Sequence, residues 1–214
     1  MLCVLAQLVG MQYEFDRARD LYTRARAMFE ELGLRVDAST LCLSSAHVEL
    51  LAGDHEAAER ELRRGYDHLA ALGERYLLSS VAGLLAETLV AAGRFDEAED
   101  AALATAELGD VSDVDAQSLW RSTRARILAH RGSLAEAEML AREAVQLLAP
   151  TDGVVAKVAA SSDLARVLLC AGRYDEARAL IAETRTLAER KGSRVMVDRL
   201  DELAAEAAQA RPVT

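Results

Sequence analysis

Two series of alanines recur along this chain at an almost constant interval. Within each series the intervals are 40, 40, 39 and 40 residues, and the members are Ala6, Ala46, Ala86, Ala125 and Ala165, and then Ala18, Ala58, Ala98, Ala137 and Ala177. Self-similarity at a fixed period of this length is typical of proteins built from stacked repeats. An alanine on each of two helices lets their backbones approach closely. A bulkier residue would overpack the contact and destabilise the fold by roughly 1–3 kcal/mol. The two series therefore predict an all-α chain of stacked helix pairs.

The composition agrees with this fold and excludes some partners. Of the 214 residues 51% are hydrophobic but only 4% are aromatic, so the core is expected to consist of small aliphatic side chains. The formal net charge of -10 disfavours direct binding to nucleic acid or to an anionic membrane, because both need clustered Lys and Arg. Three widely spaced cysteines indicate free thiols in a reducing cytoplasm. We expect a cytoplasmic protein without a metal or a cofactor.

A short motif precedes the second alanine in four of the five units. It begins with Gly53, Gly93, Gly132 and Gly172, while Tyr13 takes this position in the first unit. The glycine suits a left-handed residue at the end of one helix, and the acidic residues after it suit the positive end of the next helix. The pattern predicts helix pairs at about 2–11 and 14–32, 37–52 and 54–72, 75–92 and 94–108, 113–131 and 133–148, and 154–171 and 173–191.

This G-x-[FYL]-x-x-A pattern resembles the tetratricopeptide repeat (TPR), here with units of ~40 rather than ~34 residues. The resemblance implies a TPR-like α-solenoid of five helix pairs plus a C-terminal capping helix. The repeats are expected at about 1–33, 34–73, 74–110, 111–152 and 153–192, and the capping helix and a short tail at 193–214. The stretches 113–129 and 134–145 further resemble the C-terminal tails of bacterial adenylate/guanylate cyclase–ATPase and LuxR/MalT-type signalling regulators. The sequence has no G-x-x-x-x-G-K-[ST] loop, so the resemblance implies a regulatory arm and not an enzyme.

The boundaries between units and the two ends of the chain carry further signals. Left-handed caps are expected at Gly33, Gly73, Gly109, Gly153 and Gly192. Ser193 is placed to cap a last helix that runs to about Ala210, with charged residues on its outer side. The first helix, in contrast, is apolar on all sides, and such helices are normally buried. We therefore expect either that the chain is the tail of a longer solenoid with an upstream ATPase domain, or that this helix docks on a partner or on a second copy.

The first helix of each pair lines the concave groove in TPR proteins, and this resemblance points to candidate contacts for a protein or peptide partner. Two rows of equivalent positions supply them, namely His47, Gly83, Glu87, Ser122, Arg126, Ser162 and Arg166. Arg126 and Arg166 suit a bidentate grip on a carboxylate or phosphate. An alternative stays open, in which these are ordinary solvated groove residues and Glu87 pairs with Arg126 across adjacent units.

Other candidate sites have simpler structural explanations. His55 and Glu59 imitate a metalloprotease helix, but a glutamate stands where the second histidine is required. Trp120 is either a groove anchor or, as we favour, part of the core beside Leu119 and Leu128. The sequence thus predicts a non-catalytic interaction or regulatory module. The alternatives are a small-ligand (inducer) receptor and a free-standing peptide-binding adaptor.

Overall fold

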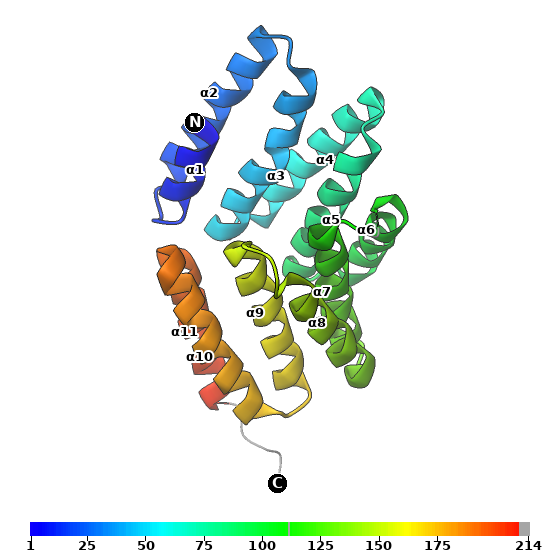
Figure 1. Cartoon of the computed structure of the whole chain (residues 1–214), viewed down its shortest axis with the longest axis vertical. Coiled ribbons are helices and arrows are strands. Elements are labelled where there is room, and N and C mark those ends of the chain that lie inside the picture. Colours follow the sequence, from blue (N-terminus) through cyan, green and yellow to red (C-terminus); the bar gives the residue numbers. More distant parts are fainter. Residues whose placement is uncertain (111, 210–214) are drawn as a thin grey trace. The chain divides into compact units, whose positions relative to one another are not determined.

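The computed structural model describes residues 1–110 and 112–209. In these two ranges the chain forms eleven helices and no strand (Figure 1). They are α1 (Leu2–Gly10), α2 (Phe15–Glu31), α3 (Arg35–Ala52), α4 (His55–Leu72), α5 (Arg75–Ala91), α6 (Phe95–Leu108), α7 (Val114–His130), α8 (Leu134–Leu148), α9 (Val154–Cys170), α10 (Tyr174–Lys191) and α11 (Arg194–Gln209). The all-α prediction is confirmed, and the helices begin and end within two residues of the predicted ranges. The expected end of the last helix at Ala210 lies outside the described residues.

The chain divides into two compact units, Met1–Asp110 and Val111–Thr214. In the first unit α1 packs on α2, α3 on α4 and α5 on α6, and each pair also packs on the next through α2–α3 and α4–α5 contacts. The second unit repeats this order with α7–α8 and α9–α10, and α11 covers α10. Within each unit the architecture is therefore a stack of antiparallel helix pairs.

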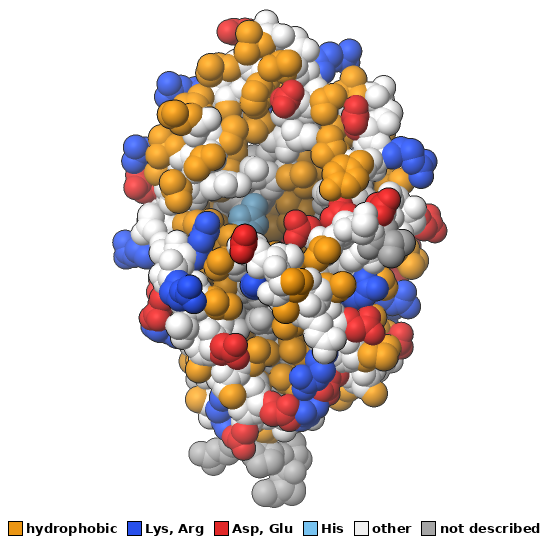
Figure 2. Space-filling view, viewed as in Figure 1, with side chains coloured by type: hydrophobic (Ala, Val, Ile, Leu, Met, Phe, Trp, Pro, Cys, Tyr) orange, Lys and Arg blue, Asp and Glu red, His pale blue; other side chains and the backbone are white. Residues whose placement is uncertain are grey.

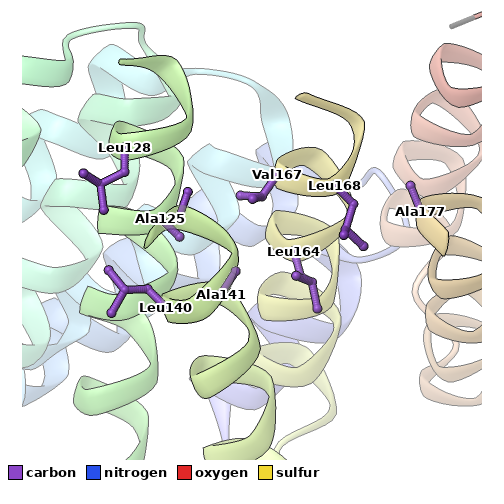
Figure 3. Close-up of a cluster of buried hydrophobic side chains, with 9 residues drawn as sticks. Ala125, Leu128, Leu140, Ala141, Leu164, Val167, Leu168 and Ala177 are labelled. Carbon is purple, nitrogen blue, oxygen red and sulfur yellow. The ribbon is translucent and has the colours of Figure 1, made fainter. Parts of the chain in front are cut away.

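All ten alanines of the two series are completely buried. In the second unit Ala125, Ala137 and Ala177 belong to one hydrophobic cluster with leucines and Val167 from α7, α8 and α9 (Figure 3). Ala6 and Ala18 lie in the corresponding cluster of the first unit. Because these positions have no room for a larger side chain, the alanines set the closeness of helix packing, as the repeat pattern predicts.

The predicted left-handed turns form within every helix pair. Gly53, Gly93, Gly132 and Gly172 have φ between 72° and 85°, and Tyr13 has φ 70° at the equivalent position. The backbone then closes the helix end, as where the Asp54 N–H donates to the Glu49 carbonyl at 2.9 Å. For a residue with a Cβ this conformation costs roughly 1–2 kcal/mol, which explains the glycines at the other four turns.

The predicted left-handed caps at two boundaries between pairs are wrong. Gly33, Gly73 and Gly192 do have positive φ, but Gly109 has φ -75° and Gly153 has φ -73°. After α8 the next residue but one is Pro150, which lacks the N–H needed to close a left-handed cap. At Gly109 a Cβ would lie 2.9 Å from the Thr105 carbonyl oxygen, so the missing side chain permits a close backbone approach there.

The last helix has the features expected of a cap. The Met196 N–H donates to the Ser193 Oγ at 3.3 Å, which satisfies a free amide at the start of α11. One face of α11 buries Val195, Leu200 and Leu203, and the other exposes charged side chains. The exposed charged residues include Arg199, Asp201, Glu202 and Glu206.

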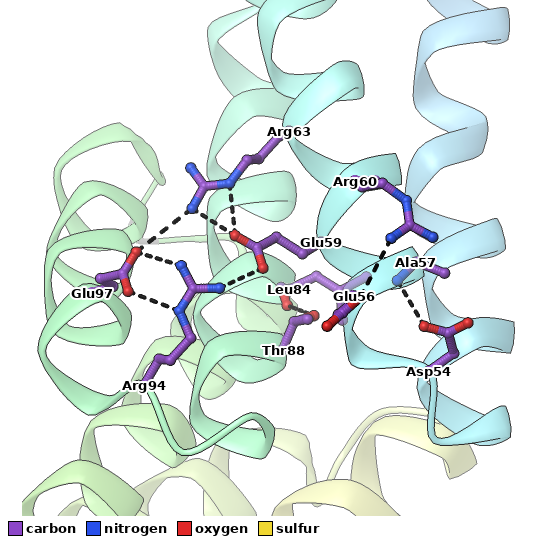
Figure 4. A network of polar contacts seen from close by, with 10 residues as sticks. All are labelled: Asp54, Glu56, Ala57, Glu59, Arg60, Arg63, Leu84, Thr88, Arg94 and Glu97. Carbon is purple, nitrogen blue, oxygen red and sulfur yellow. Dashed lines mark hydrogen bonds and ion pairs between the residues drawn. The ribbon is translucent and has the colours of Figure 1, made fainter.

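Arginine–glutamate contacts link successive pairs on the second helices. In the first unit Arg94, in the turn before α6, donates to Glu59 of α4 at 2.6 Å (Figure 4). Arg94 also donates to Glu97, and Arg63 donates to Glu59. In the second unit Arg173 contacts Glu138 in the same way, 79 residues further along the chain. The ion pair between Arg63 and Glu97 likewise has its counterpart between Arg142 and Glu176, so each unit has two ionic bridges of the same design between neighbouring pairs.

Candidate functional site

In the first unit the candidate contacts lie on α3 and α5, which pack against each other. His47 and Glu87 occupy equivalent positions on these helices and are both half-buried. Gly83 is buried on α5, so it offers little surface to a ligand. The face of the first unit therefore presents His47 and Glu87 as its polar candidates.

In the second unit the two candidate arginines already have acidic partners. Arg126 of α7 places its Nε 3.5 Å from an oxygen of Asp163 on α9, and Arg166 of α9 places an Nη 3.7 Å from Glu206 on α11. A carboxylate or phosphate that binds either arginine therefore competes with a carboxylate of the chain itself. Arg166 and Glu206 are both largely exposed, and such pairs contribute little and exchange partners readily.

Asp163 is the residue of this site that sequence reasoning missed. Its side chain is only 14% exposed and faces Arg126. Burial raises the pKa of the Asp163 carboxyl, and the charges of Arg126 and Arg166 act in the opposite direction. Asp163 is the one acidic residue of α9, and this carboxylate among mostly apolar residues, with Arg166 one turn away, was the available signal.

Two hydroxyls close to Arg126 on α7 are buried without a hydrogen-bond partner in the described part of the chain. They are the Ser122 Oγ and the Thr123 Oγ1. By contrast, the Ser162 Oγ on α9 donates to the Val158 carbonyl at 2.7 Å. A buried hydroxyl without a partner costs about 1–3 kcal/mol, so this stretch of α7 has unused hydrogen-bonding capacity.

Trp120 packs into the core, as the favoured interpretation has it. The ring lies against the cluster that contains Leu128, and its Nε1 donates to the Gln117 Oε1 at 3.1 Å. The Arg121 guanidinium lies 4.5 Å from the ring centre, a cation–π distance. These contacts give the side chain a structural role.

The first unit contains a cleft of about 250 Å³ between α2, α3 and α4 that the sequence did not predict. Its walls carry Arg26 and Arg64, which both donate to Glu61 at 2.7 Å. At its base a Cβ on Gly65 would lie 2.2 Å from the Cys42 Sγ, so the glycine is needed for this close helix contact. Burial raises the pKa of Cys42 to about 12, so its thiol stays protonated and unreactive.

Charges of both signs are mixed over the face that Figure 2 shows, with no large area of one sign. Among the residues that the structure describes, no three His, Cys, Asp or Glu side chains are grouped so as to hold a metal ion. None of the described helices combines the length and the hydropathy required to cross a membrane.

Comparison with known proteins identifies the repeat class. The sequence profile of the tetratricopeptide repeat family matches residues 158–191, which contain most of α9 and all of α10. A search of curated protein sequences finds no match.

Solved structures of similar fold include TPR proteins of different origins. A thermophilic TPR protein of Thermus thermophilus matches with a TM-score of 0.60 at 21% identity, over 96% of this chain and 98% of the other. The nearly identical TPR-like repeats of a putative kinesin light chain from Podosopora anserina match with a TM-score of 0.54 at 18% identity, over 90% of this chain and 95% of the other. BtubC (BKLC) from P. vanneervenii matches with a TM-score of 0.56 at 16% identity, over 95% of this chain and 94% of the other. The chain thus has a TPR-like solenoid fold, with a tetratricopeptide-repeat match in its fifth helix pair.

Proposed function

We propose that this chain is a non-catalytic interaction and regulatory module that binds a protein or peptide partner along the first helices of its repeats. The observation that carries the proposal is the charged group of the second unit, where Arg126 of α7 pairs with Asp163 of α9 and Arg166 of α9 pairs with Glu206 of α11. Arg166 and Glu206 are exposed, so this group reaches a surface that a partner can contact.

Arg166 is the candidate contact with the most freedom to bind. Its pair with Glu206 is exposed and long, so an acidic group on a peptide can replace Glu206 without leaving a buried charge unpaired. Arg126 is different, because removing it leaves the mostly buried carboxylate of Asp163 without its paired arginine. We therefore assign direct contact to Arg166 and a positioning role to Arg126. Ser162, one turn from Arg166 on α9, completes the proposed contacts of the second unit, and His47 and Glu87 are the proposed contacts of the first unit. Gly83 and Ser122 are buried, so they offer a partner little surface.

The regulatory part of the proposal rests on the sequence resemblance to the tails of bacterial cyclase–ATPase and LuxR/MalT-type regulators. In such an arrangement partner binding orders neighbouring helix pairs and biases an attached or associated ATPase in the cytoplasm between resting and active states. The matched ionic bridges between pairs support this idea, since each couples one pair to the next.

A second candidate function, a receptor for a small polar inducer, is favoured by a separate observation. The buried Ser122 and Thr123 hydroxyls lie one turn from Arg126 on α7 and have no partner in the described residues. A polar metabolite supplies the missing hydrogen bonds only if the helices around these hydroxyls separate, because both oxygens are enclosed. A thermal-shift screen separates the two functions, because a small ligand at 100 times its Kd adds about 2.7 kcal/mol to stability.

The proposed peptide site is tested by selecting binders from a random peptide library and measuring their affinity by isothermal titration. We expect Arg166→Ala to weaken binding about tenfold or more, as at an interface hot spot. Arg190→Ala is the matched control, because Arg190 is an exposed arginine on the second helix α10. Equal affinities for the wild type and Arg166→Ala, or equal losses in both variants, contradict the assignment.

A further inference from the structure

Helix α1 exposes residues whose counterparts in later repeats are buried. Leu8 is 51% exposed, whereas Val48 of α3, Thr88 of α5 and Val167 of α9 occupy the same repeat position and are each 1% exposed. The face formed by Met1, Val4, Leu5 and Leu8 is called the α1 face below. All four of its residues are exposed, and the hydrophobic side chains that gather over α1 and α2 are visible in Figure 2.

The same comparison holds for Met1 and Leu5 of the α1 face, whereas the counterparts of Val4 on α3 and α9, Ser44 and Asp163, are partly buried polar residues. The counterparts of Met1 on α3, α5 and α9 are Leu41, Val81 and Ala160, and all three are buried. In each case the helix is covered by the pair before it, since α3 packs on α1 and α2, α5 on α3 and α4, and α9 on α7 and α8. The α1 face therefore has the side chains of a surface that packs against helices.

Charge limits which surface of this chain can cover the α1 face. Helix α1 has no charged residue, in a chain whose formal net charge is -10. Helix α11 exposes charged residues of both signs, so a head-to-tail contact would bury charges against an apolar face at a large desolvation cost. Two α1 faces brought together bury no charged side chain of their own.

We propose that a second copy of this chain covers the α1 face, with the two α1 helices antiparallel across a two-fold axis. This isologous contact uses one patch on both copies and closes at the dimer. The patch is a single helix with four large apolar side chains, much smaller than the roughly 800 Å² per partner of a standard interface. The dimer is therefore reversible and weak, and none of its four residues is among the proposed partner contacts on α3, α5, α7 and α9.

The test is sedimentation equilibrium of the full chain over a roughly hundredfold concentration range, which resolves a dimer of this strength. We expect a monomer–dimer equilibrium with no larger species. We expect Leu8→Glu to raise the Kd at least about tenfold, because each copy would bury a carboxylate in an apolar contact. Leu103→Glu on α6 is the matched control, since Leu103 is similarly exposed and the substitution is the same.

Two further measurements distinguish this contact from others. An uncharged interface keeps its Kd between low and high salt, whereas a contact between two net acidic α11 sides strengthens as salt screens their repulsion. Hydrogen exchange of the α1 amides slows as the concentration rises, and that of α11 does not. Val4→Glu is a second variant of the α1 face, and both it and Leu8→Glu change exposed positions. Circular dichroism is therefore expected to show the wild-type helical content in both variants.

Several results overturn the proposal. One is a monomer at every concentration, which means that the α1 face needs a different partner or a preceding helix pair. Another is a dimer that Leu8→Glu does not weaken, or that Leu103→Glu weakens equally. A mass that continues to grow past the dimer contradicts the two-fold arrangement, because it indicates an open head-to-tail assembly.

Discussion

At the residue scale, the end of α5 shows how a side chain can be excluded by backbone geometry alone. Gly93 has φ 76°, and a Cβ built there would meet no atom within 4 Å. Any cost of a larger residue at this position therefore comes from the left-handed backbone and not from a clash. The same turn of the first pair carries Tyr13 at φ 70°, which shows that the fold tolerates this strain once.

We therefore expect Gly93→Ala to lower the free energy of unfolding by about 1–2 kcal/mol, measured by urea denaturation. Gly93→Asn is the comparison variant, because asparagine tolerates the left-handed region better than alanine does. Its loss is expected to be clearly smaller. Similar losses in the two variants, or no loss in either, show that the turn is not under this backbone constraint.

Residue-scale prediction from the sequence worked where the cause is local. The glycines of the motif and the Ser193 cap depend on residues within one turn of each other, and these predictions are confirmed. The predicted left-handed caps at Gly109 and Gly153 were wrong because the helix end alone does not decide their backbone. Gly109 lies close to the Thr105 carbonyl, and Pro150 stands shortly before Gly153. Asp163 was missed because its partner Arg126 comes from another helix, and sequence spacing does not show such a contact.

At the element scale, successive second helices are joined through Glu138 and Arg173. Hydrogen bonds from Arg142 and Arg173 lower the pKa of Glu138 below its ordinary value. A carboxyl whose pKa is lowered in the folded state stabilises the fold above its unfolded pKa of about 4.3, and this stabilisation is lost as the pH falls through the folded pKa. The bridge between α8 and α10 is therefore a neutral-pH contact.

We expect Glu138→Gln to lower the melting temperature at pH 7 and to differ little from the wild type in strong acid, below about pH 3. Glu183→Gln is the control, since Glu183 is an exposed carboxylate on α10. That variant is expected to follow the wild-type curve across the range. If Glu138→Gln lowers the melting temperature by the same amount at every pH, or by more in acid, the assigned role of the bridge is contradicted.

Helix positions were the most predictable elements, because the repeat motif supplies each helix end with its own turn signal. The cleft between α2, α3 and α4 was not predictable in the same way. It depends on Gly65 and Cys42, which lie on different helices and reach each other only after α3 and α4 have packed. Gly65 is the one glycine inside a second helix, so it was a visible signal without an assigned partner.

At the scale of the whole molecule, the alanine series explain why one architecture recurs in both compact units. A buried alanine at the same two positions in every pair allows the pairs within each unit to stack at the same closeness. Recognition is then left to exposed positions that the stacking does not restrict. This freedom is why the fold follows from the period, whereas the identity of the partner does not.

The most direct test of this account compares two alanine-to-leucine substitutions on the same helix. Ala177 belongs to the second series and is completely buried on α10, whereas Ala182 is exposed on α10. By equilibrium unfolding in urea, Ala177→Leu is expected to lose roughly 1–3 kcal/mol and Ala182→Leu to stay within about 0.5 kcal/mol of the wild type. Equal unfolding midpoints for the two variants would contradict the claim that the buried alanines set the packing of this fold.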